Sequence, residues 1–190
     1  MGIFLKEIKP DMGIKNTNDR YGTIAIFLHW VMAFIIIFML ALGLYMVRLP
    51  VSPQKIKLFG WHKEFGMLIL MLACFRIGWR LASTIPTLPK EIPSWQKIAA
   101  RTVHWAMYVF MFAMPITGWL TTSAADFPVS FFGLFTIPTL IAPDAHLREL
   151  FGEIHEWIAY GLIATICIHI AAAIKHHFIN KDNVLIGMLP

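Results

Sequence analysis

Residues 152–178, which read GEIHEWIAYGLIATICIHIAAAIKHHF, decide how this chain folds. The run is apolar over at least the ~20 residues that an α-helix needs to cross a hydrocarbon core. His155 and His169 lie inside it, although ionisable groups within a membrane are costly and mark functional sites. The stretch therefore predicts a transmembrane helix that carries a site.

The composition of the whole chain is that of a membrane protein. Of the 190 residues, 58% are hydrophobic and 14% are charged, which excludes a disordered chain and disfavours a soluble domain. The net charge of +5 does not indicate a nucleic-acid partner, because the basic residues are scattered around apolar runs. No C-x-x-C-H motif for covalent haem attachment occurs.

Three further segments have membrane length, at about 24–47, 61–82 and 102–122. Pro115 lies inside the last of them and is expected to kink or locally loosen it. Strands are not expected, because the apolar runs are unbroken and lack a period of two. The predicted fold class is an all-α membrane protein, a four-transmembrane-helix bundle spanning residues 21–190, preceded by a cytoplasmic N-terminal extension at 1–20.

The basic residues predict the orientation of this bundle in the lipid bilayer. Four spans place both termini on one side, and eleven of the 16 Lys and Arg residues fall on that side. By the positive-inside rule, both termini are predicted to be cytoplasmic. We expect the proline-rich link 83–100 to be extended, and the aromatic loop 123–154 to lie in the membrane interface over the outer end.

Four histidines fall at two depths of this bundle. His155 and His169 are fourteen residues apart, which is ~21 Å along a helix and returns to nearly the same face. His62 shares the outer level with His155, and His29 shares the cytoplasmic level with His169. Two pairs of facing imidazoles suit bis-histidine ligation of b-type haem.

Other interpretations of these residues stay open. An intramembrane histidine can also hydrogen-bond to a neighbouring helix, and His104 competes with His29 or His169 as a ligand at the cytoplasmic level. A single zinc site holding all four histidines is excluded by the ~21 Å separation. Gly66 and Gly161 are expected to leave space beside the histidines for a flat macrocycle.

Polar side chains near the cytoplasmic level are candidates for contacts to the cofactor. Arg76 is a candidate partner of a haem propionate, with Arg80 and Arg101 as helpers. Snorkelling to the membrane surface explains these arginines equally well. His176 follows His169 by seven residues and is a candidate propionate contact or proton relay, although a solvated helix end also explains it.

Several motifs carry a family resemblance that extends from about Arg20 to the end of the chain. They are FLHW at 27–30, GWHKEFG at 60–66, the spacing of His155, Glu156 and His169, and the ending HHFINKDNVLIGMLP at 176–190. With these motifs the sequence resembles the bacterial cytochrome b561 family.

The resemblance implies a dihaem cytochrome of the bacterial inner membrane with two haem b groups. By match of motif, His29 and His169 would bind the inner haem iron, and His62 and His155 the outer one. The resemblance also implies a superoxide oxidase, which takes electrons from superoxide outside and passes them to ubiquinone or another membrane quinone. An anionic substrate favours a basic approach, for which the outer side offers Arg48, Lys55, Lys57 and Lys63.

Two alternatives to this activity stay open. A cytochrome b anchor would relay electrons between the quinone pool and a partner dehydrogenase or periplasmic cytochrome. A haem-free transporter or structural bundle would use the histidines only for packing.

Overall fold

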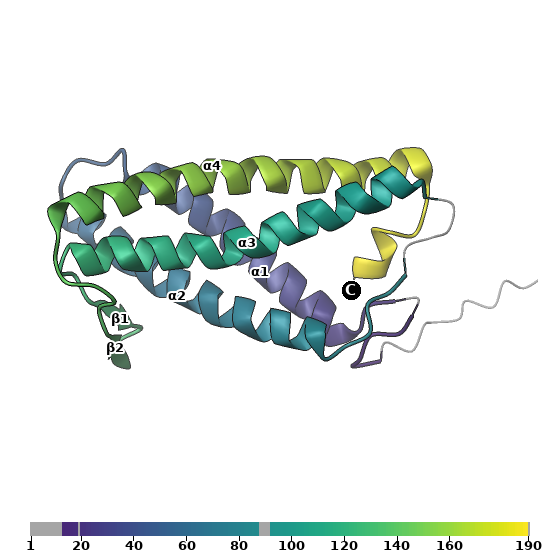
Figure 1. The fold of residues 1–190 in the computed structure, drawn as a ribbon, viewed down its shortest axis with the longest axis horizontal. Helices are drawn as coiled ribbons and strands as arrows, with labels where there is room; N and C mark the ends of the chain where they lie inside the picture. Colours follow the sequence, from purple (N-terminus) through teal and green to yellow (C-terminus); the bar gives the residue numbers. More distant parts are fainter. Residues whose placement is uncertain (1–12, 19, 88–91, 190) are drawn as a thin grey trace, which may run out of the picture.

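Four long helices form the body of the protein (Figure 1). The computed structural model describes residues 13–18, 20–87 and 92–189. Within these residues the helices are α1 (Thr23–Met46), α2 (Pro53–Leu81), α3 (Ser94–Ala124) and α4 (Ala145–Lys175). Each is long and apolar enough to cross a membrane. The predicted fold class, a bundle of four membrane-spanning helices, is confirmed.

The predicted start of each of the last three helices is wrong by eight residues or less, because the helices begin in polar flanking sequence. Ser52 accepts a hydrogen bond from the Lys55 amide ahead of α2, and Asp144 accepts one from the Leu147 amide ahead of α4. Helix α3 begins directly after Pro93. The apolar run marks only the hydrocarbon-facing part of a helix, whereas the capping residue sets its start. Residues 94–100 and 145–154 are therefore helical rather than connecting segments.

The loop between α3 and α4 contains two short strands, so the expectation of no strands is wrong there. Strand β1 (Val129–Phe131) pairs antiparallel with β2 (Phe135–Ile137). Phe132 and Gly133 take positive φ values of 49° and 74° in the turn, which closes the hairpin. The Phe132 ring lies 5.3 Å from the Phe65 ring of α2, so the loop does lie against one end of the bundle.

Helix α3 continues through Pro115 as one element, so the proline does not end the helix. Pro115 is buried, and the surrounding helices hold the segment in place. A proline inside a transmembrane helix is tolerated when neighbouring helices and side chains compensate for its missing N–H.

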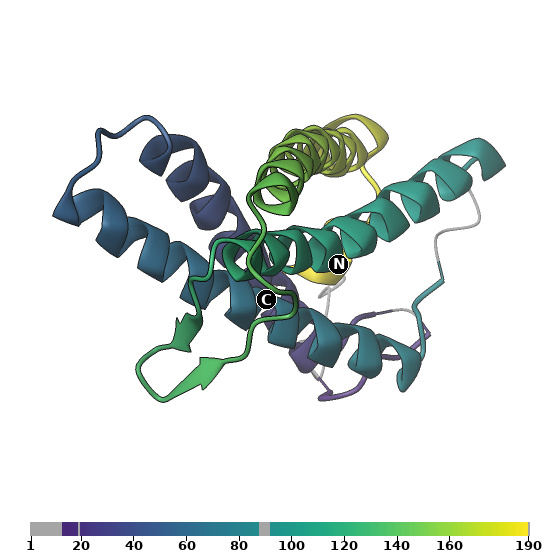
Figure 2. The ribbon, with the colours of Figure 1, turned by 60° about the vertical axis from the view of Figure 1, so that its left-hand side comes forward.

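The helices pack in chain order, α1 with α2, α2 with α3, and α3 with α4 (Figure 2). Buried side chains from all four helices form one core that includes Met32, Ala73, Met111 and Leu162. Large apolar side chains such as Phe34, 76% exposed, point outward. An apolar outer surface of this kind suits contact with lipid.

Both ends of the described chain lie at the same end of the bundle, which we call the terminal end. After α4 the chain forms a π-helical turn (His176–Asn180) and a 3-10 turn (Ile186–Met188) and returns to α1. There the Trp30 indole donates a 2.7 Å hydrogen bond to the Met188 carbonyl. Residues 13–18 also lie here, where Asn16 accepts from the Gly22 amide. The opposite end, which carries β1 and β2, is called the hairpin end.

Candidate functional site

His62 and His155 form a facing pair near the hairpin end. His62 belongs to α2 and His155 to α4, and their ring centroids are 6.2 Å apart with an interplanar angle of 76°. Helices α2 and α4 are not among the helix pairs that pack along one another in the described chain. The two imidazoles therefore come from helices that do not pack closely along their length.

His29 and His169 form a second pair near the terminal end. His29 belongs to α1 and His169 to α4, and their ring centroids are 6.1 Å apart with an interplanar angle of 69°. This pair also joins two helices that do not pack along one another. The pairing expected from depth along the sequence is therefore the pairing that the fold brings together.

Both separations fit two imidazoles on opposite sides of one haem iron. A metal–imidazole bond is ~2.0 Å long and the ligating nitrogen lies ~1.1 Å from its ring centre, so the centres would be about 6.2 Å apart. Direct aromatic contact covers a broader range, ~4.5–7 Å. The observed separations, 6.1 and 6.2 Å, both agree with the distance expected for two ligands of one iron. Direct contact alone would allow any value in the broader range.

His104 is a third imidazole at the terminal end. It lies on α3 with its ring centroid 5.4 Å from that of His169. That distance is shorter than the about 6.2 Å expected for two ligands of one iron, so His104 fits the role of a packing neighbour better than that of a ligand. The described residues contain no group of three or more His, Cys, Asp or Glu side chains that could hold a metal ion without haem.

Two glycines provide the backbone surfaces on which His62 and His155 pack, and neither was predicted from the sequence. A Cβ atom at Gly43 would lie 3.3 Å from Cε1 of His62, and one at Gly118 would lie 3.1 Å from Cε1 of His155. Each imidazole therefore packs directly on the backbone of a neighbouring helix, where a larger residue would push it away. Both glycines lie near the hairpin-end termini of their helices. They are therefore at the depth of His62 and His155, and this depth could have identified them from the sequence.

The two glycines that were singled out from sequence behave differently from each other. A Cβ at Gly66 would meet no atom within 4 Å, which fits the expected space beside His62. A Cβ at Gly161 would lie 3.0 Å from Cζ of Phe110. The expectation for Gly161 is therefore wrong, because its missing side chain accommodates an aromatic ring of α3.

The Nδ1 atoms of the histidines have different surroundings. Nδ1 of His155 lies 3.0 Å from the Thr117 hydroxyl, and Nδ1 of His29 lies 3.3 Å from a guanidinium nitrogen of Arg76. Nδ1 of His62 is buried and has no hydrogen-bond partner among the described residues. Such contacts decide which ring nitrogen carries the proton and which one is free to bind iron.

Arg76 and Arg80 line a small pocket at the terminal end. Its other lining residues include Tyr21, Trp79, Tyr108 and Met188. The indole nitrogen of Trp79 is buried without a hydrogen-bond partner in the described structure, so a donor is available beside two guanidinium groups. Arg101 lines a separate groove on the surface of α3, so only two of the three candidate arginines come together.

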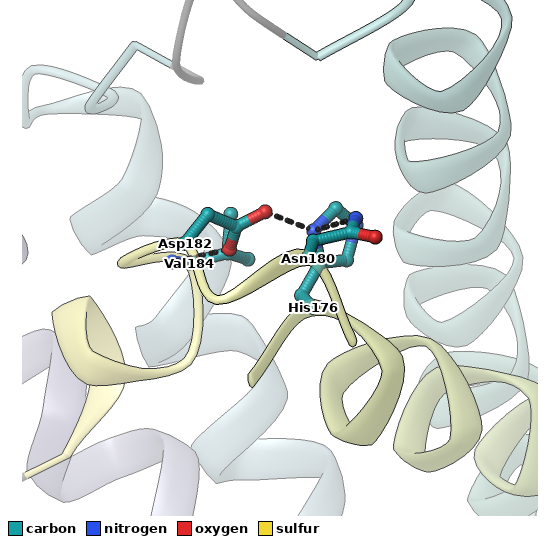
Figure 3. A network of polar contacts seen from close by, with 4 residues as sticks. All are labelled: His176, Asn180, Asp182 and Val184. Atoms are coloured by element: carbon teal, nitrogen blue, oxygen red, sulfur yellow. Dashed lines mark hydrogen bonds and ion pairs between the residues drawn. The ribbon is translucent and has the colours of Figure 1, made fainter. Parts of the chain in front are cut away.

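His176 belongs to a polar network that turns the chain at the end of α4 (Figure 3). Its Nδ1 forms a hydrogen bond and ion pair with the Asp182 carboxylate. The other carboxylate oxygen of Asp182 accepts from the Val184 amide, and Lys181, directly before Asp182, takes a left-handed φ of 54°. His176 therefore fixes the turn that sends the C-terminal segment back toward α1.

The basic residues at the hairpin end are partly used in the fold. The Lys55 ammonium donates to the Leu49 carbonyl at 2.6 Å, and that of Lys63 donates to the Pro128 carbonyl at 3.4 Å. The Lys57 ammonium lies over the Trp61 ring. Arg48 and Lys57 are exposed. These four basic residues therefore lie between the end of α1 and the first part of α2, with Lys63 adjacent in sequence to His62.

A bundle of four membrane-length helices with facing histidines on separate helices has the architecture of a membrane cytochrome that binds b-type haem. The chain belongs to the prokaryotic cytochrome b561 family, whose model matches residues 20–190. Family membership implies haem b, electron transfer and a multi-pass position in the bacterial inner membrane. A haem-free transporter or structural bundle is thereby set aside.

Three relatives match nearly the whole chain. Cytochrome b561 homolog 2 of Escherichia coli is 37% identical and covers 94% of this chain and 95% of its own length. Cytochrome b561 homolog 1 of the same organism is 30% identical, covering 90% and 98%. The probable superoxide oxidase CybB of Yersinia pestis is 27% identical, covering 91% and 97%.

Proposed function

We propose that this protein moves electrons across the bacterial inner membrane through two haem b groups. His62 and His155 would bind one iron at the hairpin end, and His29 and His169 the other at the terminal end. The observation that carries the proposal is the equal separation of the two ring pairs, 6.2 and 6.1 Å. The haems would supply one-electron redox chemistry, while the protein supplies ligands, orientation and exclusion of water.

The terminal end is proposed to face the cytoplasm and to bind the haem propionates. A guanidinium group only donates hydrogen bonds, so its contact with His29 at 3.3 Å uses the Nδ1 lone pair. Ligation through Nε2 needs the proton on Nδ1, and Arg76 then has to release His29. Arg76 becomes free to pair with a propionate, beside Arg80 and the unpartnered Trp79 indole.

The proposed reaction is oxidation of superoxide coupled to reduction of ubiquinone. Two superoxide anions lose one electron each and become dioxygen, and one ubiquinone takes both electrons and two protons to become ubiquinol. A relative bears the name probable superoxide oxidase, and the exposed cations Arg48 and Lys57 at the hairpin end offer an approach for an anion.

Proton supply for ubiquinone reduction is proposed for the terminal end. His176 and Asp182 form a hydrogen-bonded acid–base pair near the membrane surface. An imidazole held by a carboxylate is suited to passing a proton. His176 would thus serve both the C-terminal turn and the proton path.

The test uses purified protein as isolated from membranes. The ratio of haem to protein and the Soret absorbance are measured first, and two haems per chain are expected. Superoxide generated in the presence of ubiquinone should then produce ubiquinol, and superoxide dismutase should abolish the product. A haem-free preparation would overturn the cofactor proposal. A two-haem protein that superoxide does not reduce, but a partner dehydrogenase does, would instead support the electron-relay anchor.

A double variant addresses the basic approach at the hairpin end. Changing Arg48 and Lys57 to Gln removes two exposed cations without touching the histidines. We expect the rate of reduction by superoxide to fall and its salt dependence to weaken. The matched control is Arg101→Gln on the α3 surface near the terminal end, which should leave that rate unchanged.

A further inference from the structure

The Thr117 hydroxyl is the feature of the hairpin-end site that the proposed function does not use. Thr117 lies on α3, is 8% exposed, and places its Oγ1 3.0 Å from Nδ1 of His155 on α4. It therefore joins two packed helices by a buried polar contact. The one side-chain partner of this hydroxyl among the described residues is His155.

The direction of this hydrogen bond follows from the other contacts of Thr117. Its Oγ1 lies 2.8 Å from the Ala113 carbonyl and 3.0 Å from the Met114 carbonyl. A carbonyl only accepts, and the hydroxyl has one hydrogen, which must point to one of these two oxygens. The lone pairs of Oγ1 are left for His155, and the Met114 carbonyl also accepts a hydrogen bond from this ring. Both neighbours are acceptors, so Nδ1 of His155 carries the proton and donates.

Backbone packing holds the imidazole in this position. A Cβ at Gly118 would lie 3.1 Å from Cε1 and 3.4 Å from Nδ1 of His155. The ring thus lies against the α3 backbone, directly beside the Thr117 hydroxyl. Thr117 and Gly118 therefore form one continuous contact surface for the His155 ring.

We infer that Thr117 is a positioning residue that selects the Nδ1–H tautomer of His155 and leaves its Nε2 lone pair free for the hairpin-end iron. The inference rests on the proposed dihaem function. A hydrogen bond at the non-ligating nitrogen fixes ring orientation and raises the basicity of the ligand. His62 lacks such a partner among the described residues, so the effect falls on one ligand of one haem.

The competing explanation is that Thr117 only bonds to its own helix. Threonine hydroxyls in transmembrane helices commonly bond to the carbonyl four residues earlier, and Thr121 one turn later does so with the Thr117 carbonyl at 2.8 Å. Thr121→Val therefore removes the same kind of bond without affecting His155. This variant is the matched control.

The experiment compares Thr117→Val, Thr117→Ser and Thr121→Val in purified holoprotein. Haem content of the wild type is measured first, and fewer than two haems would contradict the proposed function rather than this inference. The hairpin-end haem is identified as the component lost in His155→Ala. In Thr117→Val, its affinity should fall about 10- to 100-fold and its midpoint potential should rise, because a less basic ligand stabilises ferric iron less.

Three further results complete the test. Thr117→Ser keeps the hydroxyl and should restore wild-type affinity and potential, and Thr121→Val should match the wild type. The terminal-end haem should be unchanged in every variant. If Thr117→Val does not accumulate in cells, Thr117→Ala replaces it in the same measurements. Wild-type affinity and potential in the valine or alanine variant, or equal changes in Thr121→Val, would overturn the inference.

Discussion

The two histidine pairs have nearly the same ring separation but lie in different surroundings. At the hairpin end, His155 and His62 pack on glycine backbones, and the nearest side-chain partner of His155 is the neutral Thr117. At the terminal end, His169 and His29 are joined by a third imidazole and by a guanidinium group. The nearly equal spacing of the rings is what the proposed ligation requires, while the unequal neighbours give each pair its own electrostatic character.

The difference suggests a direction for electron flow. A positive charge close to a redox centre stabilises the added electron and raises its reduction potential. Arg76 lies 3.3 Å from His29 itself, and Arg80 lines the same pocket. In the described chain, no basic side chain of the hairpin end is hydrogen-bonded to His62 or His155. The haem proposed at the terminal end should therefore have the higher potential. Electrons would then move from the hairpin end toward the terminal end, as the proposed chemistry requires.

Removing a proposed ligand should have the largest effect. His155→Ala is expected to abolish haem binding at the hairpin end and leave the terminal-end haem in place, and His29→Ala should do the reverse. The haem-to-protein ratio should fall from about two to about one, as two bis-histidine sites require, and the two variants should differ in their reduced-minus-oxidised spectra.

The matched control for the ligand variants is His146→Ala, an exposed histidine in the first turn of α4. It should retain both haems. Loss of both haems in His155→Ala alone would show that the two sites do not bind independently, and the comparison between them would fail.

Replacing Gly118 by alanine should have a smaller effect than removing a ligand. In Gly118→Ala the new methyl group would lie 3.1 Å from the His155 ring, and overpacking of this kind costs about 1–3 kcal/mol. We expect roughly tenfold weaker haem binding at the hairpin end, measured by titration of haem into the depleted protein. Gly60→Ala, where an added Cβ meets no atom within 4 Å, should bind as the wild type does.

Neutralising Arg76 should change a potential without removing a haem. Loss of one nearby charge in a partly wet site is worth on the order of 1 kcal/mol, or ~40 mV for a one-electron couple. Arg76→Gln should therefore lower the potential of the terminal-end haem by about this amount in a redox titration. An unchanged potential, equal to that of the control Arg101→Gln, would place Arg76 away from the cofactor.

The smallest effect is expected for His104. Its ring centroid lies 5.4 Å from that of His169, which is too close for two ligands of one iron, so His104→Ala should retain both haems with at most a small potential shift. Loss of the terminal-end haem in this variant, together with its retention in His29→Ala, would assign the ligand role to His104.

Much of the architecture follows from local sequence. The length of each apolar run identifies the four spans, and the spacing of His155 and His169 places them at two depths on one face. The helix starts were less accurate, because the caps at Ser52 and Asp144 lie outside the apolar runs. The hairpin in the α3–α4 loop was missed because its strands are only three residues long.

By itself, then, the sequence determined the number of spans, the two levels of histidines and the candidate ligands, because hydrophobic length and helical periodicity depend only on neighbouring residues. Only the tertiary structure decided which imidazole of α1 or α3 stands opposite His169, and which glycine and hydroxyl of α3 hold His155. These choices depend on how each helix is rotated about its axis against its neighbours, and packing between helices sets that rotation.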